Sequence, residues 1–125
     1  METLHIEKTD TTPLIHFDSQ TGIMTIRGRS VTENPLSFYA PVVKWLEEYK
    51  NYPKQKVVLE VQLEYFNTSS SKCLLDVFKK FAAISRSGTP VEVNWWCEEV
   101  DDEMREAGED YQDLVGLPFN ILTIS

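Results

Sequence analysis

The segment VVLEVQLEYFNTSSSK, residues 57–72, contains the pattern that decides the fold. Its first part alternates between apolar and polar side chains, which predicts a strand over residues 56–66 with one buried and one solvated face. After residue 72, apolar residues recur at helical spacing, which predicts an amphipathic helix over about residues 69–86. The expected inward positions are Val57, Leu59, Val61, Leu63 and Tyr65 of the strand, and Leu74, Val77, Phe78 and Phe81 of the helix.

A run of polar side chains, Asn67 to Ser71, lies where this strand passes into the helix. Asn, Thr and Ser are preferred N-cap residues, because their side-chain oxygens accept hydrogen bonds from otherwise unpaired backbone N–H groups. A single cap explains one residue of the run and leaves four consecutive hydroxyls, Thr68 to Ser71, only partly explained. The residues alone leave two interpretations open: helix capping, and a phosphorylation or anion site at the positive end of a helix.

The remaining pattern predicts an α/β chain in the order ββαβαβαβ, with one more strand or a loose arm around residues 4–6. Alternating strands indicate a sheet with only one covered face, so we expect a two-layer sandwich: a mixed sheet with three helices packed on one side. The expected elements are a hairpin over residues 13–28, a helix whose regular part begins at Pro41 and ends near Lys50, a strand over residues 91–96, a helix over residues 101–114, and a strand over residues 119–124.

Length and composition predict one domain over residues 1–125, with enough apolar residues for a core. No apolar run approaches the roughly 20 residues needed to cross a membrane, and no signal-peptide pattern opens the chain. We therefore expect a cytoplasmic protein without membrane insertion. Cys73 and Cys97 lack metal-like spacing, and we interpret both as buried or half-buried structural thiols.

The net charge of −8 arises from one segment. Residues 98–113 contain nine acids and one base, Arg105, while the rest of the chain is balanced. This distribution argues against binding to nucleic acid or an anionic membrane. We interpret the acids as the solvated face of the third helix, or else as a docking surface for a basic partner. The apolar stripe expected on this helix is Val100, Met104, Ala107, Tyr111 and Leu114.

No catalytic constellation emerges from the sequence. His5 and His16 have no partners at metal-binding spacing, and no phosphate-binding glycine loop or nucleophile elbow is present. We expect no catalytic residue, no metal site and no cofactor. A small thiol enzyme that uses Cys73 or Cys97 is the alternative from another class. Alternation sends either Trp95 or Trp96 to the open sheet face, where a tryptophan would be an interface anchor.

The expected two-layer architecture, with a hydroxyl cluster at the start of the second helix, resembles that of the anti-sigma-factor antagonists with the STAS fold, such as SpoIIAA. The details are more similar to the SiaC family of bacterial regulatory phosphoproteins, along essentially the whole chain. The matching segments are Tyr65-Phe66-Asn67-Thr68-Ser69-Ser70-Ser71-Lys72, Leu4-His5-Ile6, Thr11-Thr12-Pro13, Glu33-Asn34-Pro35, Gly88-Thr89-Pro90-Val91 and Leu117-Pro118-Phe119. The Asn-Thr-Ser-Ser run is the most specific of them.

This resemblance implies a non-enzymatic partner switch. Thr68 would be phosphorylated by a SiaB-like kinase and dephosphorylated by a SiaA-like phosphatase of the PPM type. The unphosphorylated form would bind and activate a SiaD-like diguanylate cyclase, raising cyclic di-GMP and promoting aggregation or biofilm growth. Partner-binding residues would be Asn67, Thr68, Ser69, Ser70 and Lys72. The alternative of similar fold is an antagonist that binds an anti-sigma kinase.

Overall fold

The computed structural model describes residues 1–124 as one six-stranded sheet and three helices. Strands and helices follow the predicted order, and the short strand at the N-terminus is formed. The elements are β1 (Leu4–Ile6), β2 (Leu14–Phe17), β3 (Ile23–Ser30), α1 (Pro35–Tyr49), β4 (Val57–Phe66), α2 (Thr68–Arg86), β5 (Val91–Glu98), α3 (Asp102–Val115) and β6 (Phe119–Ile124).

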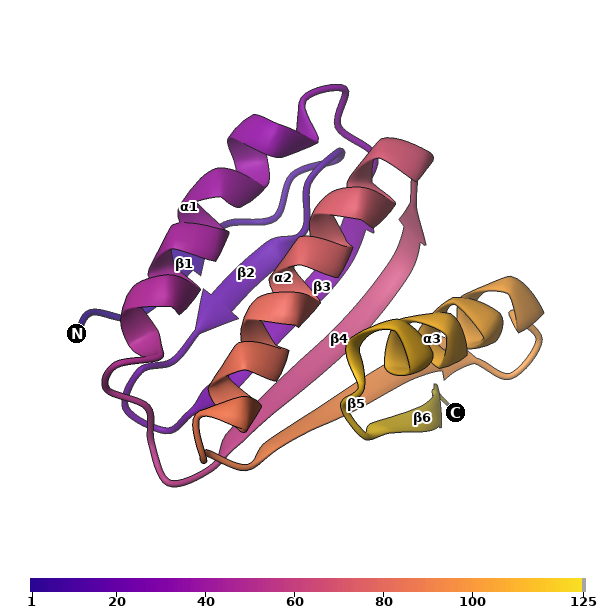
Figure 1. Cartoon of the computed structure of the whole chain (residues 1–125). Coiled ribbons are helices and arrows are strands. Elements are labelled where there is room, and N and C mark those ends of the chain that lie inside the picture. The colour runs from indigo at the N-terminus through magenta and orange to yellow at the C-terminus, as the bar shows by residue number, and fades with distance from the viewer. Residues whose placement is uncertain (125) are drawn as a thin grey trace.

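The sheet is mixed, and its strands lie side by side in the order of the sequence. β1, β2 and β3 pair antiparallel, which confirms the predicted hairpin, while β3 to β6 are parallel. Each parallel step requires a crossover that returns the chain to the opposite end of the sheet, and α1, α2 and α3 supply these crossovers. The first helical turns of α1, α2 and α3 therefore follow directly from the carboxyl ends of β3, β4 and β5 (Figure 1).

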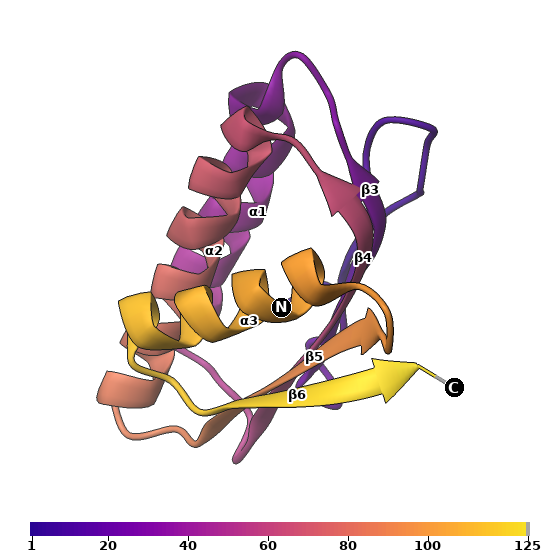
Figure 2. The same ribbon diagram turned by 90° about the vertical axis from the view of Figure 1, so that its right-hand side faces the viewer.

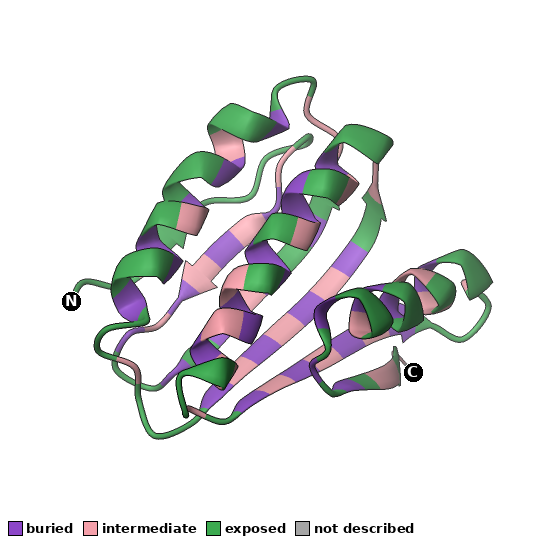
Figure 3. Ribbon diagram, in the orientation of Figure 1, coloured by how far each residue is buried: buried purple, intermediate pink, exposed green. Residues whose placement is uncertain are grey.

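All three helices lie on the same side of the sheet, as the sequence predicts (Figure 2). Along β4 and β5, buried positions alternate with half-buried ones, because only one face of the sheet is covered (Figure 3). The open face carries polar side chains that bond to one another. Glu60 accepts hydrogen bonds from Trp96 Nε1 at 2.8 Å and Asn94 Nδ2 at 2.6 Å. No helix within residues 1–124 is long and apolar enough to span a membrane.

The expectation that α1 becomes regular only at Pro41 is wrong. The helix runs unbroken from Pro35 to Tyr49 with Pro41 inside it. A proline in a helix removes one N–H and leaves the carbonyl of the residue four positions earlier without its partner. Here Pro41 and Ser37 are both exposed, so the carbonyl without its partner belongs to the solvent side of α1.

Three expected core positions are also wrong. Tyr65 is 54% exposed, since a register shift opposite Gly28/Arg29 ends the strict alternation of β4 after Leu63. Val100 and Leu114 are 86% and 64% exposed. The helical period of 3.6 residues places Val115 rather than Leu114 in phase with Met104 and Tyr111. The observed stripe of α3 is Met104, Ala107, Gly108, Tyr111 and Val115.

Gly108 allows α3 to lie directly against the sheet. The Trp95 ring is completely buried and donates its Nε1 proton to the carbonyl of Met104 at 2.9 Å. A Cβ atom at position 108 would lie 2.6 Å from Cδ1 of this ring, closer than van der Waals contact permits. The indole has no space to retreat, because it packs on Phe78, Tyr111 and Phe119.

We predict that Gly108→Ala lowers the free energy of unfolding by about 1–3 kcal/mol, the usual cost of overpacking a core. This outcome is unusual for a helix interior, where alanine is intrinsically preferred over glycine by about 1 kcal/mol. Urea denaturation measures the difference, with Glu109→Ala on the exposed side of the same helix as the control. A Gly108→Ala protein as stable as the parent would contradict the close approach of α3 to Trp95.

Candidate functional site

The polar turn between β4 and α2 is held by the side chain of Asn67. Asn67 is the N-cap, and its Oδ1 accepts hydrogen bonds from the backbone N–H of Ser70 at 2.9 Å and from Ser69 Oγ at 3.3 Å. Its Nδ2 donates to the carbonyl of Thr32 at 3.2 Å, and its backbone N–H donates to the carbonyl of Ser30 at 3.0 Å. The start of α2 is thus tied to the end of β3 and the loop that follows it.

A chain of three buried hydroxyls lies directly beneath this turn. Ser30 Oγ donates to Ser70 Oγ at 2.9 Å and lies 2.7 Å from Tyr39 Oη. Ser30 and Ser70 are completely buried and Tyr39 nearly so. Burial raises the pKa of Tyr39 to about 12, which keeps its hydroxyl protonated and available as a donor. The chain joins β3, α1 and α2 at one point.

The Thr68 hydroxyl is the exception among the four in the run. Ser69 Oγ bonds to Asn67, Ser70 Oγ belongs to the buried chain, and Ser71 Oγ donates to the Thr68 carbonyl at 2.6 Å. The Thr68 hydroxyl has no hydrogen-bond partner among residues 1–124, and its residue is exposed on the first position of α2. The capping interpretation is therefore satisfied by Asn67 and leaves Thr68 available.

The other predicted partner-binding residues differ in accessibility. Ser69 and Lys72 are exposed, Asn67 is half-buried, and Ser70 is completely buried. Ser70 therefore supports the turn from below and is out of reach of a partner or a kinase. Ser30 and Tyr39 were not predicted from the sequence as residues of the site. A signal existed, since Ser30 is in phase with the inward residues Met24 and Ile26 of β3, where a serine needs a buried hydrogen-bond partner.

The titratable groups outside this turn do not form an active centre. His5 Nδ1 lies 2.8 Å from His16 Nδ1, and His5 Nε2 lies 2.7 Å from a carboxylate oxygen of Glu7, all at the exposed edge of the sheet. The described residues contain no group of three or more histidine, cysteine, aspartate or glutamate side chains able to hold a metal ion. Cys73 and Cys97 are buried, and desolvation raises the pKa of both thiols, which disfavours the reactive thiolate.

We predict that Ser30→Ala destabilises the protein by about 1–3 kcal/mol, because the hydroxyls of Tyr39 and Ser70 lose a buried partner. Ser71→Ala, which removes a hydroxyl that bonds only within its own helix, should change stability by less than about 0.5 kcal/mol. Chemical denaturation of the two variants beside the parent makes the comparison. Equal stability of all three proteins would show that the hydroxyl chain does not support the turn.

Known proteins are similar to this chain in both fold and sequence. The model of the SiaC family of regulatory phosphoproteins matches residues 6–124. An uncharacterized protein of Pseudomonas aeruginosa (strain UCBPP-PA14) is 30% identical over 121 residues, which cover 97% of this chain and 96% of that protein.

Two solved structures from Pseudomonas aeruginosa superpose on nearly the whole chain. Apo-SiaC has a TM-score of 0.88 and 29% identity, and the match covers 98% of this chain and 100% of that one. SiaC in complex with the diguanylate cyclase SiaD, of which it is the activator, has a TM-score of 0.89 and 29% identity, covering 97% and 99%. The agreement of family model, relative and structures extends over nearly the whole described fold, and the chain belongs to the SiaC family of regulatory phosphoproteins.

Proposed function

We propose that this protein is a phosphorylation-controlled binding module whose switch is the hydroxyl of Thr68. A SiaB-like kinase adds the phosphate and a SiaA-like phosphatase of the PPM type removes it. The bare form binds and activates a SiaD-like diguanylate cyclase in the cytoplasm, which raises cyclic di-GMP and favours biofilm growth. The observation that carries the proposal is that Thr68 alone, among the four clustered hydroxyls, is exposed and without a hydrogen-bond partner in the described structure.

The scaffold around Thr68 is built to accept a phosphate without rearrangement. The cap bonds of Asn67 and the buried chain beneath it do not involve the Thr68 hydroxyl, so a phosphate there breaks none of them. The first turn of α2 contains no acidic side chain that would repel the new charge. A negative charge at a helix N-terminus contributes about 0.3–1 kcal/mol in favour of the folded state.

The same phosphate obstructs a partner that packs over the turn. Phosphorylation adds about −1.5 to −2 charge and three acceptor oxygens. A protein surface that closes over this group must remove its hydration shell, which is costly unless the surface supplies arginine or lysine side chains. Modification therefore weakens docking by electrostatics and desolvation while the fold stays the same. In this scheme Thr68 is a substrate, and the catalytic groups belong to the kinase and the phosphatase.

The arrangement of the described residues supports a binding protein rather than a thiol enzyme. A cysteine nucleophile needs a thiolate and an adjacent base, whereas Cys73 and Cys97 are buried with raised pKa values. The anti-sigma antagonist differs from the proposed module only in its partner. The two functions are distinguished by which protein is retained on the bare form.

We predict that Thr68→Ala binds the cyclase from the same organism as tightly as the parent protein and activates it constitutively. Stoichiometric phosphorylation of the parent at Thr68 should weaken binding at least about a hundredfold, as expected when an unpaired charge is buried at an interface. The affinity of Thr68→Asp for the cyclase should lie between those of Thr68→Ala and the phosphorylated parent, since a carboxylate has less charge and fewer oxygens than a phosphate. Calorimetric titration and the rate of cyclic di-GMP formation measure the two effects.

Ser71→Ala is the matched control, because it removes a neighbouring hydroxyl outside the expected partner-binding set and leaves the Thr68 hydroxyl in place. It should bind, activate and respond to the kinase like the parent. If Thr68→Ala abolishes binding while its fold is intact, the hydroxyl itself is part of the interface, and the account of a purely obstructive phosphate fails.

A further inference from the structure

The two central strands of the parallel sheet separate before they end. β4 and β5 are paired only from Val57↔Val91 to Val61↔Trp95, although β4 continues to Phe66 and β5 to Glu98. Beyond the last pair the strands diverge, and α3 moves away with β5 (Figure 1). We use the term fork for the space between residues 62–66 of β4 and residues 96–98 of β5. The fork opens at the carboxyl end of the sheet, next to the turn that carries Thr68.

Each wall of the fork has a free strand edge. Residues 62–66 of β4 are paired with β3 on one side, through Gln62↔Arg27 to Phe66↔Ser30, and residues 96–98 of β5 are paired with β6 on the other side. Within the described residues, no ladder joins these two stretches to each other. Unpaired N–H and C=O groups at a strand edge are a template for a further strand, and extended peptide segments bind proteins in this way.

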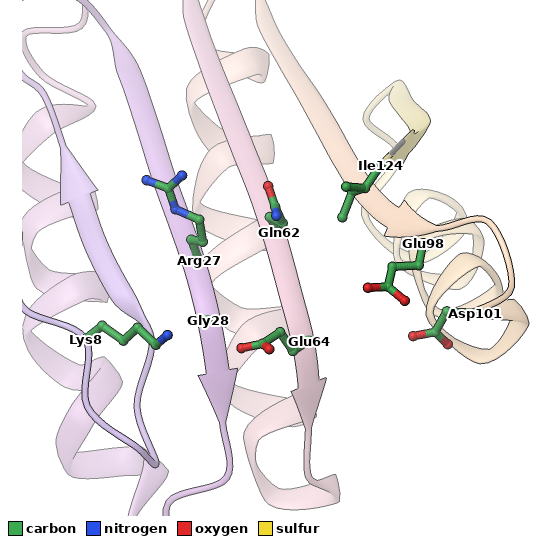
Figure 4. Close-up of a pocket in the computed structure, with 8 residues that line it drawn as sticks. All are labelled: Lys8, Arg27, Gly28, Gln62, Glu64, Glu98, Asp101 and Ile124. Atoms are coloured by element: carbon green, nitrogen blue, oxygen red, sulfur yellow. The ribbon is translucent and has the colours of Figure 1, made fainter.

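On the open face of the sheet the fork adjoins a cleft of about 440 Å³ that is lined by three acids and two bases. Glu98 points across the fork toward β4, whereas the Asp101 carboxylate caps α3 by accepting a hydrogen bond from the backbone N–H of Met104 at 3.0 Å. Lys8 and Arg27 lie on the far side of the cleft, beyond β4 (Figure 4). Glu64 stands on β4 between these two bases and Glu98. Glu64 and Glu98 are exposed, and neither side chain forms an ion pair or hydrogen bond with another described residue.

On the helix side the fork adjoins a second, more apolar cleft of about 230 Å³ between β4 and α3. Its apolar lining is Tyr65, Phe66, Met104 and Ala107. Its acidic lining is Glu103 together with Glu64 and Asp101, which also line the first cleft. The exposed Tyr65 therefore lies at a place where a neighbouring strand would cover it. The two clefts are the two sides of one opening.

We infer that the fork binds an extended segment of a partner protein in which basic and apolar residues alternate. Side chains of a strand point alternately to the two faces of a sheet. A segment paired with residues 62–66 therefore directs one set of side chains to Glu64 and Glu98 on the open face and the other set to Phe66 and Met104 on the helix side. Charge complementarity selects lysine or arginine for the first set.

A second copy of this chain does not meet these requirements. Its two edge strands, β1 and β6, have the sequences LHI and FNILTI and contain no lysine or arginine. Placing β6 in the fork would also bring the acidic helix α3 against the acids of the fork. The inference depends on the free strand edges and on carboxylates rather than on the Thr68 hydroxyl. It can therefore be tested independently of the proposed function.

A peptide titration followed by nuclear magnetic resonance tests the inference on the intact, isotopically labelled protein. The probe is an acetylated and amidated hexapeptide that alternates arginine with valine, and its control carries glutamate in place of arginine. We expect the arginine peptide to shift the amide resonances of residues 62–66 and 96–98, and added salt to weaken the effect. The glutamate peptide should leave these resonances unchanged.

Charge-reversed variants identify the side chains responsible. Glu64→Lys combined with Glu98→Lys should weaken binding of the arginine peptide at least about tenfold, the effect of losing charge-assisted hydrogen bonds. Glu106→Lys combined with Glu109→Lys makes the same change in net charge at exposed positions of α3 and should weaken binding less than about threefold. If the charge-reversed double variant folds poorly, the double variant with Glu64→Gln and Glu98→Gln removes the same two charges without reversing them.

Any of four results would overturn the inference: no shifted resonance at millimolar peptide, shifts confined to α1 and α2, equal binding of the two peptides, or equal binding by the fork variants and the α3 control. The measurement with the cyclase is separate. If that complex forms normally with the fork variants and fails only on phosphorylation, the proposed function survives without the fork.

Discussion

The buried hydrogen bonds of Ser30 determine where the functional turn lies. Ser30 Oγ reaches both Tyr39 of α1 and Ser70 of α2, and its carbonyl accepts the backbone N–H of Asn67. Three elements that are distant in sequence therefore meet at one residue at the end of β3. Unpaired buried hydroxyls cost about 1–3 kcal/mol each, so the native arrangement is strongly preferred over any in which this turn shifts. Thr68 lies on top of this fixed support and contributes nothing to it.

The carboxyl end of the sheet is accessible because helices cover only one of its two faces. Parallel strands joined by helical crossovers place all three helix starts at the same end, and the open face has no second layer to hide the strand ends. Gly108 lets α3 follow β5 closely, and β5 in turn separates from β4 after Trp95. The Thr68 turn and the fork are thus neighbours for a structural reason. Both result from how this sheet ends.

The sequence predicted the fold well and the site only in part. Alternation in β4 and the periodicity of α2 depend on burial along a single element, and both are strong enough to read without tertiary information. Tyr65 was assigned wrongly, because a register shift between strands depends on a neighbour that the sequence does not show. Val100 lies in the turn before α3, and Leu114 is out of phase with Met104 and Tyr111. The hydroxyl run was found, but only the structure distinguishes Asn67 as the cap, Ser70 as a buried support and Thr68 as the free hydroxyl. The fork was invisible, since nothing in an alternating strand reveals where its partner leaves it.

The central claim is that Thr68 alone in this turn carries the regulatory modification. Intact-mass and fragment-mass spectrometry of the protein purified from its own host, with and without phosphatase treatment, tests this claim most directly. The account predicts a single phosphate, located on Thr68 and removed by the phosphatase. A phosphate on Ser69 or Ser71 instead, or none under any growth condition, would contradict it and return the turn to ordinary helix capping.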